Sequence, residues 1–376
     1  MKSMKSTLFT LSLFLLANSP AFASPSPPTG DSAYITQAGS GGSVTTEQTE
    51  TAGSPNKITV DQYAGSLNET ATATQAGDGL NKATIIQAGD DDTATITQLG
   101  YSGTAAIAQS GASWHNATIT QYGASQSETA GIRQTGSHHT AVISQSGDTD
   151  GAAITQISQS GNTATIVQGS ASEIGLATIT QRALNSTGFI NQDGPANGAS
   201  ILQSGSYNSA TIDQGTGSVF ESADITQSGT NNSVTIKQYG TTDDAQITQE
   251  IGDNNLADIT QAFGVSNGSN IAGISQSGSS NGASIVQDGA LNTATIDQPG
   301  SSNGSTVSQT GDSNSATINQ PGSVNTAEIV QLGSSHIAQI LQSGNNNAAT
   351  FNQSGTARFF RLEQTGNGDT VTITQN

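Results

Sequence analysis

Cysteine is absent from the 376 residues, and bulky side chains are scarce: only 4% of the residues are aromatic and 10% are charged. Without cysteine the chain has neither disulfides nor thiolate metal sites. So few large side chains cannot fill the two or three ordinary globular domains that this length would allow. Lys and Arg number 9 against 28 Asp and Glu, so the clustered cations that neutralise phosphates are missing. The composition therefore argues against a conventional globular core and against a nucleic-acid or anionic-membrane partner.

Residues 1–23 have the three parts of a secretory signal peptide. Lys2 and Lys5 supply the basic start, residues 8–16 an apolar run, and residues 21–23 a small-x-small cleavage site. A membrane anchor would need about 20 apolar residues, which is longer than this run, and no later segment is apolar enough to span a bilayer. We therefore expect an exported chain without a transmembrane segment, in which residues 24–32 are a short Pro-rich leader.

A ten-residue pattern, A-x-I-x-Q-x-G-x-x-N, recurs along the rest of the chain. Anchored on its Gln, it occurs thirty times between Gln37 and Gln375, and from Gln276 onward the spacing is a constant 11 residues. Earlier copies lie 11 to 15 residues apart, as insertions in loops would produce. Two residues before the Gln stands Ile in 24 copies, and four before it stands Ala in 23. Repetition on this scale indicates an architecture in which each unit buries its apolar face only against its neighbours.

The alternation within the pattern predicts strands. Ala, Ile and Gln fall on one face of an extended segment, and the intervening residues, mostly Thr, Ser, Asp or Ala, fall on the other. Gly stands two residues after the Gln in 21 of the 29 copies that extend so far, where it supplies a tight turn with positive φ available. Every proline beyond residue 30 lies outside the strand windows, as strands require. The repeat therefore encodes strand, turn, strand, turn.

A short strand that buries one Ala, one Ile and one Gln has to stack on others. With two strands and two turns per coil, each coil takes about 22 residues. We therefore expect an all-β fold, a β-solenoid of about fifteen two-stranded coils forming two facing parallel sheets over residues 33–376.

The repeated Gln needs partners, because burying a primary amide without hydrogen bonds costs about 1 to 3 kcal/mol. In stacked coils each Gln lies over the Gln of the next coil, so the amides can join in a ladder. Asn, six residues before the Gln in 14 copies, is a second candidate for such a ladder, although Asn is also common in turns. In the regular copies the predicted ladder consists of Gln276, Gln287, Gln298, Gln309, Gln320, Gln331, Gln342, Gln353, Gln364 and Gln375, with Asn281, Asn292, Asn303, Asn314, Asn325 and Asn347.

These residues resemble the curlin repeat of curli major subunits, S-x5-Q-x-G-x-x-N-x5-Q, and the segment from Asn281 to Gln298 carries the match. The resemblance covers residues 33–376. It implies a secreted subunit that polymerises into functional amyloid fibres of the biofilm matrix, with roles in surface adhesion and cell aggregation. Two features depart from the family: familiar curlins have far fewer coils, and their longer Gly-rich export segment is represented only by residues 24–32.

The resemblance further implies passage through the periplasm, a place in extracellular cell-surface fibres, and three partners: other copies of the chain, a nucleator subunit and a curli-type outer-membrane secretion pore. For the contact between copies we expect uncapped end strands, because the unpaired backbone groups of an edge strand can pair with another chain. Head-to-tail docking of such ends does not close, so it produces filaments. The expected edge residues are Ala33, Ile35 and Gln37 at one end and Val371, Ile373 and Gln375 at the other.

Other functions fit the sequence less well. The four histidines, His115, His138, His139 and His336, lack catalytic neighbours, and His139 and His336 stand in the Asn phase. We therefore expect no enzyme and no metal or cofactor site. The Thr-x-Thr doublets of an ice-binding solenoid occur in only five copies. A monomeric surface adhesin or display stalk is the alternative function, and it would need an anchor or a binding module.

Acidic residues gather at positions 90–92, at Asp148 and Asp150, and at positions 243–244. We interpret them as solvated turns that keep the subunits soluble before assembly. Weak binding of a divalent cation between coils is the alternative, because turns can supply several oxygen ligands.

Overall fold

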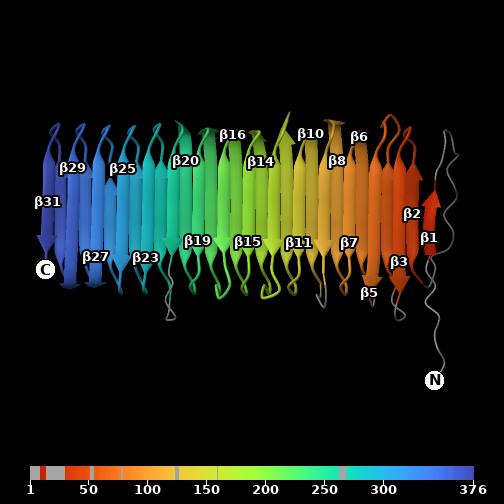
Figure 1. Cartoon of the computed structure of the whole chain (residues 1–376), viewed down its shortest axis with the longest axis horizontal. Coiled ribbons are helices and arrows are strands. Elements are labelled where there is room, and N and C mark those ends of the chain that lie inside the picture. Colours follow the sequence, from red (N-terminus) through yellow and green to blue (C-terminus); the bar gives the residue numbers. More distant parts are fainter. Residues whose placement is uncertain are drawn as a thin grey trace, which may run out of the picture. The chain divides into compact units, whose positions relative to one another are not determined.

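The computed structural model describes residues 9–13, 30–50, 55–77, 79–122, 127–158, 160–261 and 268–376. Within these ranges the regular elements are all strands. The chain divides into two compact units, Met1–Asn185 and Ser186–Asn376. In each unit the odd-numbered strands form one sheet and the even-numbered strands form a second one (Figure 1). Each unit is a β-solenoid with two parallel sheets, which confirms the predicted fold class.

The strands of the first unit are described in chain order within their two sheets. The odd sheet contains β1 (Phe9–Leu13), β3 (Ser43–Glu50), β5 (Thr70–Gly77), β7 (Thr93–Gln98), β9 (Asn116–Gln121), β11 (Thr140–Gln145) and β13 (Thr163–Gln168). The even sheet contains β2 (Ser32–Gln37), β4 (Lys57–Gln62), β6 (Lys82–Asp90), β8 (Thr104–Ser113), β10 (Thr129–Ser137), β12 (Gly151–Ser158) and β14 (Leu176–Leu184).

The second unit repeats this arrangement. Its odd sheet contains β15 (Thr187–Gln192), β17 (Ser209–Gln214), β19 (Ser233–Gln238), β21 (Leu256–Gln261), β23 (Gly282–Asp288), β25 (Gly304–Thr310), β27 (Thr326–Ser334), β29 (Ala348–Thr356) and β31 (Thr370–Gln375). Its even sheet contains β16 (Gly198–Ser206), β18 (Ser222–Thr230), β20 (Asp244–Asp253), β22 (Ile271–Gln276), β24 (Thr293–Gln298), β26 (Ser315–Asn319), β28 (Ile337–Gln342) and β30 (Phe359–Gln364).

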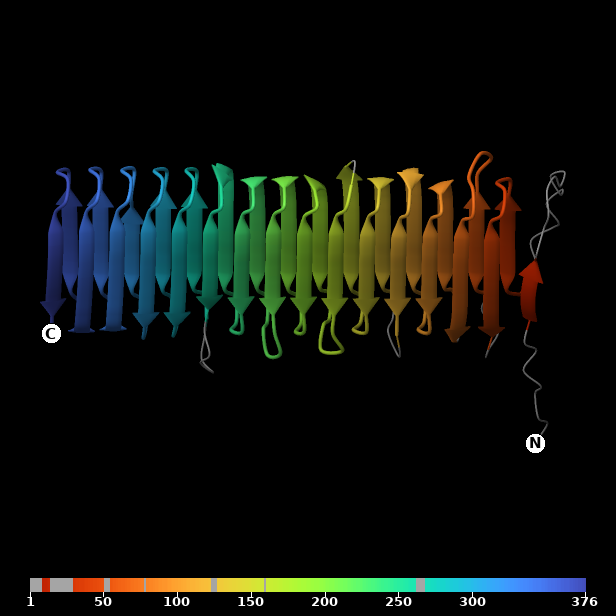
Figure 2. The ribbon, with the colours of Figure 1, turned by 45° about the horizontal axis from the view of Figure 1, so that its top comes forward.

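The register between neighbouring strands matches like with like. In the pair β22 and β24, Ile274 lies beside Ile296 and Gln276 beside Gln298, and the same correspondence holds throughout both units. Consecutive strands run in opposite directions in the two layers of each unit (Figure 2), so within each unit the strands from β2 onward pair in parallel with the second strand along the chain. The strands β2 to β31 number thirty, one for each copy of the repeat. Taken two to a coil, they agree with the predicted number of about fifteen coils.

The interior of each unit is formed by the face that the alternation predicts. In β21 the burial pattern alternates residue by residue, and Ala257, Ile259 and Gln261 are fully buried. Small Ala and branched Ile suit the narrow space between two close sheets. A wider filling occurs near the C-terminus, where the rings of Phe351 and Phe360 stack with centroids 3.9 Å apart.

Copies with wider spacing place their additional residues in the turns. Seven residues, 169–175, separate β13 from β14, yet β14 keeps its parallel register with β12. The pairing also continues on both sides of the irregular spacing between Gln261 and Gln276, because β20 pairs with β22 and β21 with β23. Insertions in this chain therefore leave the sheets intact.

One strand departs from the parallel order. β1 pairs antiparallel with β3, with Leu11 beside Thr46, and it lies inside the predicted signal peptide. The rest of that peptide, and residues 24–29 of the predicted leader, lie outside the described residues. In the described part of the chain no helix has the length and apolarity needed to cross a bilayer.

Candidate functional site

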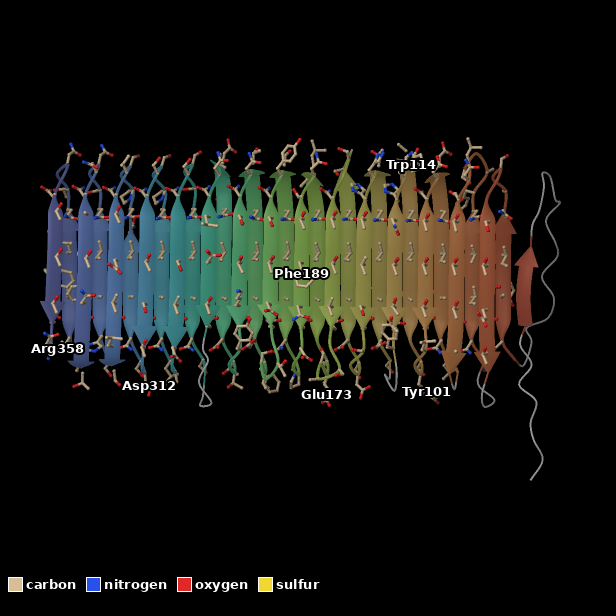
Figure 3. The ribbon with its side chains drawn as sticks, viewed as in Figure 1. Tyr101, Trp114, Glu173, Phe189, Asp312 and Arg358 are labelled. Atoms are coloured by element: carbon tan, nitrogen blue, oxygen red, sulfur yellow. The ribbon has the colours of Figure 1, made fainter. Side chains whose placement is uncertain are left out.

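The Gln side chains form hydrogen-bonded columns inside both units. Each Nε2 donates to Oε1 of the Gln in the next coil, over 2.7 to 3.1 Å. The rows of like side chains that cross the strands are visible in Figure 3. In the first unit these columns contain Gln48, Gln75, Gln98, Gln121, Gln145 and Gln168 in the odd sheet and Gln62, Gln87, Gln109, Gln134, Gln156 and Gln181 in the even sheet. In the second unit they contain Gln192, Gln214, Gln238, Gln261, Gln287, Gln309, Gln331, Gln353 and Gln375, and Gln203, Gln227, Gln249, Gln276, Gln298, Gln320, Gln342 and Gln364.

All the amides in these columns point the same way. Gln309 donates to Gln331 over 2.8 Å and also to the backbone carbonyl of Thr293 over 3.0 Å. The backbone bond fixes which end of the amide is the nitrogen, because a carbonyl accepts only from an N–H. Within each unit the column is therefore a directed chain. Among the described residues, Gln48 of the first unit donates onward but receives no amide, and Gln375 of the second unit receives one from Gln353 and donates none onward.

The Asn columns have a different bonding pattern from the expected amide ladder. The Oδ1 of Asn281 accepts the backbone N–H of Asn303 over 3.0 Å, and the Nδ2 of Asn303 donates to the backbone carbonyl of Gly322 over 2.8 Å. Asn side chains thus bind the main chain of the next coil and not one another. The arrangement satisfies turn N–H and C=O groups that would otherwise be buried without partners. Asn281, Asn292, Asn303, Asn314, Asn325 and Asn347 all accept in this way.

Other polar residues replace Asn at the same position and are equally buried. They include Asp92, Asp150 and Asp243, each at most 1% exposed. The interpretation of these three as solvated turn residues is therefore wrong. Each accepts a backbone N–H from the next coil, as Asn does: Asp92 from His115, Asp150 from Gly175 and Asp243 from Asn270. Their place six residues before the Gln identifies these three Asp residues as members of the Asn column. The acidic residues around them give no such indication.

Three of the turns place Glu in this column, followed by Asp in the next coil. The pairs are Glu69 with Asp92, Glu128 with Asp150, and Glu221 with Asp243. Burial raises the pKa of Glu221 to about 8, and the neighbouring Asp243 adds to the rise, although the N–H of Gly240 opposes it. Burial likewise raises the pKa of Glu69 to about 7 and that of Asp92 to about 6. These carboxyl groups favour the protonated form more than exposed ones do.

Histidines occupy the same column in the first unit. His115 and His139 stack with ring centroids 5.1 Å apart, and the Nδ1 of His139 accepts the N–H of Asn162 over 3.2 Å. Burial lowers the pKa of His115 to about 4, and His139 contributes to the shift. Both rings therefore act as neutral acceptors in place of Asn. Among the described residues no group of three or more His, Asp or Glu is arranged to hold a metal ion.

The Gly of the repeat allows the turns to stack closely. A Cβ on Gly322 would lie 1.8 Å from the carbonyl oxygen of Gly344, and one on Gly333 would lie 1.9 Å from that of Gly355. No side chain fits at these distances, so Gly is required there by the neighbouring coil. The positive φ expected of this Gly occurs in some turns, such as 124° at Gly333, but a left-handed residue is found more regularly just before the Asn column, as at Leu291 and Val324 with φ of 59° and 60°.

Inner-face side chains lose their cover in the terminal strands. Among the described strands, β2 is bonded to β4 alone and β31 to β29 alone. Residues that are fully buried elsewhere in the repeat are partly or fully exposed in these two strands. They are the predicted edge residues Ala33, Ile35, Gln37, Val371, Ile373 and Gln375.

The two sheets differ at their first strand. In the odd sheet β1 occupies the outer edge of β3, whereas we had expected nothing to cover the first coil. In the even sheet the outer edge of β2 has no strand beside it among the described residues. Gln37 is not joined to its column, because the Oε1 of Gln62 has no hydrogen-bond partner in the described part of the chain.

The comparisons with known proteins agree with this geometry. The family model of the curlin associated repeat matches residues 67–100, 89–123, 116–147, 184–217, 222–250, 292–322 and 322–355, which together are more than half of the chain. None of the curated proteins compared with the chain matches it. Repeats of this family suggest a structural subunit of the curli type, and the fold described above is that of a structural protein. The chain belongs to the curlin-repeat family.

Proposed function

We propose that the chain is a secreted structural subunit that polymerises head-to-tail into extracellular amyloid fibres of the biofilm matrix, where the fibres serve surface adhesion and cell aggregation. The observation that carries the proposal is the incomplete state of the terminal strands. β2 and β31 present unpaired backbone groups and exposed apolar side chains of the inner face, which soluble proteins normally avoid.

The direction of the Gln columns supports docking of unlike ends. Gln375 carries amide N–H groups that no further coil accepts, and Gln48 carries an amide oxygen that receives no amide. If β3 of a second copy pairs with β31, Gln375 can donate to Gln48 of that copy. The odd column then continues by one more bond of the same kind. Because the two joined surfaces differ, the contact repeats without closing and generates a filament.

Export precedes assembly in this proposal. Residues 1–23 act as the signal peptide and residues 24–32 as the leader of the exported chain, which passes the periplasm and leaves through a curli-type outer-membrane pore. A nucleator subunit starts the fibre. These partners are proposed from membership of the family.

The test uses the purified chain from residue 24 onward, which retains all thirty repeat strands. We expect binding of an amyloid dye together with filaments in electron micrographs, and growth that accelerates when preformed filaments are added. A chain that stays monomeric by light scattering, and binds no dye, contradicts the proposal and favours the alternative function as a surface adhesin or display stalk.

A fused cap makes the test specific for the terminal strand. A stable, negatively charged helical domain joined after Asn376 should block growth, because it covers β31. The same domain inserted between the exposed residues Ser170 and Ala171 is the control, and it should leave growth within about threefold of the unmodified chain, because long turn insertions cost little. Equal growth of both fusions contradicts the role of β31.

A further inference from the structure

The two ends of the even-sheet Asn column carry opposite charges. This column lies six residues before each Gln, and its first residue is Asp31, before β2, and its last is Arg358, before β30. Arg358 is the single Lys or Arg among the thirty residues at this position of the repeat. It lies at the edge of the strands in Figure 3. A lone cation in a column of Asn and acidic residues indicates a special partner.

Neither residue has an oppositely charged side chain beside it in the part of the chain that the structure describes. Arg358 donates from Nε to the carbonyl of Ser354 over 2.9 Å and from Nη2 to the main-chain oxygen of Asn376, the final residue. Asp31 accepts the N–H of Asn56 on Oδ1 over 2.8 Å. In the described part of the chain the one ion pair joins Arg361 to Glu363, over 3.9 Å. Among the described residues, therefore, no Asp or Glu side chain pairs with Arg358, and no Lys or Arg side chain pairs with Asp31.

We propose that Arg358 of one copy pairs with Asp31 of the next copy, and that this charge pair sets the register of the joint. The inference rests on the proposed head-to-tail assembly and adds to it the residues that align the two ends. Within the sheet, the register of β28 and β30 places Ile337 beside Phe359 and Gln342 beside Gln364. The same register carried across the joint places Phe359 beside Ser32 and Gln364 beside Gln37, which puts Arg358 beside Asp31.

The bonding of the column explains why the last residue differs from Asn. The Asn side chains of the column accept an N–H from the next coil, as Asn314 does from His336 over 3.0 Å. Arg358 has no acceptor atom, so it cannot continue that pattern. It can instead donate to a carboxylate, and the second carboxylate oxygen of Asp31 has no hydrogen-bond donor among the described residues. A guanidinium and a carboxylate form stronger hydrogen bonds than two neutral amides.

The odd sheet fits the same joint. Its Asn column ends with Asp369, before β31, and begins with Gly42, before β3. Inside the first unit an Asp followed by a Gly already occurs at this position, where Asp150 accepts the N–H of Gly175 over 2.9 Å. Asp369 can accept the N–H of Gly42 of the next copy in the same way. β1 occupies the edge of β3 in the full-length chain, so this joint forms in the chain that lacks residues 1–23.

The experiment reverses each charge separately. The chain from residue 24 onward is prepared as D31R, as R358E, and as the control R361E, which makes the same change three residues later on the exposed face of β30. Elongation is measured on filaments of the same variant. We expect D31R and R358E each to slow elongation at least about tenfold, because like charges meet at the joint, and R361E to change it less than about threefold, because exposed ion pairs contribute little.

Mixing the two reversed chains is the decisive measurement. Each joint between D31R and R358E again brings opposite charges together, so an equimolar mixture should elongate within about threefold of the unmodified chain while each variant alone does not. The neutral variants D31N and R358Q are controls for misfolding. D31N retains the side-chain oxygen that accepts the N–H of Asn56. Both should elongate more slowly than the unmodified chain at low salt and equally fast at high salt, because salt screens the pair.

The outcomes separate this inference from the proposed function. Absence of filaments from the unmodified chain overturns both. Filaments that elongate equally in D31R, R358E and R361E, or neutral variants with the salt dependence of the unmodified chain, overturn the charge pair and leave head-to-tail assembly in place.

Discussion

Single residues decide how closely the coils approach. In the regular copies the Gly two residues after the Gln faces the backbone carbonyl of the same Gly one coil later, and the space between them excludes even a methyl group. The Asn column makes the second close contact through the main chain. The Gly therefore allows the backbones of two coils to approach closely, and the Asn provides hydrogen bonds to backbone groups. Neither residue buries much apolar surface.

The requirement for Gly is tested with Gly322→Ala. The added Cβ would lie 1.8 Å from the carbonyl of Gly344, so two coils have to separate locally, and we expect a loss of about 1 to 3 kcal/mol in the free energy of unfolding, as in other overpacked sites. The control is Gly304→Ala, where nothing lies within 4 Å of the new Cβ. It should be neutral or slightly stabilising. Urea unfolding of the freshly prepared monomer measures both, and equal midpoints contradict the role of Gly322.

Buried carboxyl groups make the stability of the second unit depend on pH. The pKa of Glu221 is raised in the folded chain from 4.5 to about 8. A raised carboxyl pKa means that the folded state binds the proton more tightly, so this stabilisation is complete below pH 4.5 and is lost as the pH rises through 8. We expect unfolding to become easier between pH 5 and pH 9, and Glu221→Gln to weaken that dependence. A variant with the same pH profile as the unmodified chain contradicts the assignment.

In the first unit, His115 has the opposite effect on the pH dependence of stability. Its pKa is lowered to about 4, so the stability that it contributes is complete above pH 6.5 and is lost as the pH falls through 4. His115→Asn restores the residue typical of the column, and it should reduce the loss of stability between pH 6.5 and pH 4. Hydrogen exchange of the neighbouring turns at these two pH values measures the effect.

At the level of the element, the strand derives its stability from its place in a column. Gln309 receives a hydrogen bond from Gln287 and donates to Gln331. Gln309→Leu retains the size of the side chain but leaves two buried amides without their partners, and each unsatisfied group costs about 1 to 3 kcal/mol. Gln339→Leu, on the exposed face of β28, is the control. We expect a lower urea midpoint for the first variant alone.

β1 and β3 offer a second test at this level. The chain with residues 1–23 should assemble more slowly than the chain without them, because β1 occupies the edge on which another copy docks. A full-length chain with Leu11→Pro and Ser12→Pro keeps its length but loses N–H donors to β3, so its lag time should approach that of the shortened chain. Equal lag times for all three chains contradict a covering role of β1.

The sequence predicts the strands well because one pattern is repeated thirty times and chance deviations average out. The Ile and Gln phase identifies the buried face, and the structure agrees at positions such as Ile259 and Gln261. The buried state of Asp92, Asp150 and Asp243 is harder to predict, because acidic residues beside turns are usually solvated. The bonds of Asn to the main chain are also not evident from sequence, since they depend on how near the next turn comes.

At the level of the whole molecule, the directed columns would give the proposed filament two unlike ends. One end presents Gln364 and Gln375 with amide N–H groups, and the other presents Gln37 and Gln48 of the first strands. Unequal surfaces bind an incoming subunit with different rate constants, so we expect growth mainly from one end. Filaments seeded with one fluorescent label and extended with another show this directly, and extension of equal length at both ends contradicts it.

The turns that absorb length differences offer a practical use. The seven-residue turns at 169–175 and 215–221 differ in composition, and the strands that follow them retain their register. A short peptide tag grafted into such a turn would leave the hydrogen-bonded layers untouched. In a polymer of this chain, every subunit would then carry the tag at the same position. Enzymes or binding peptides attached to the tags would be displayed at regular intervals along the polymer.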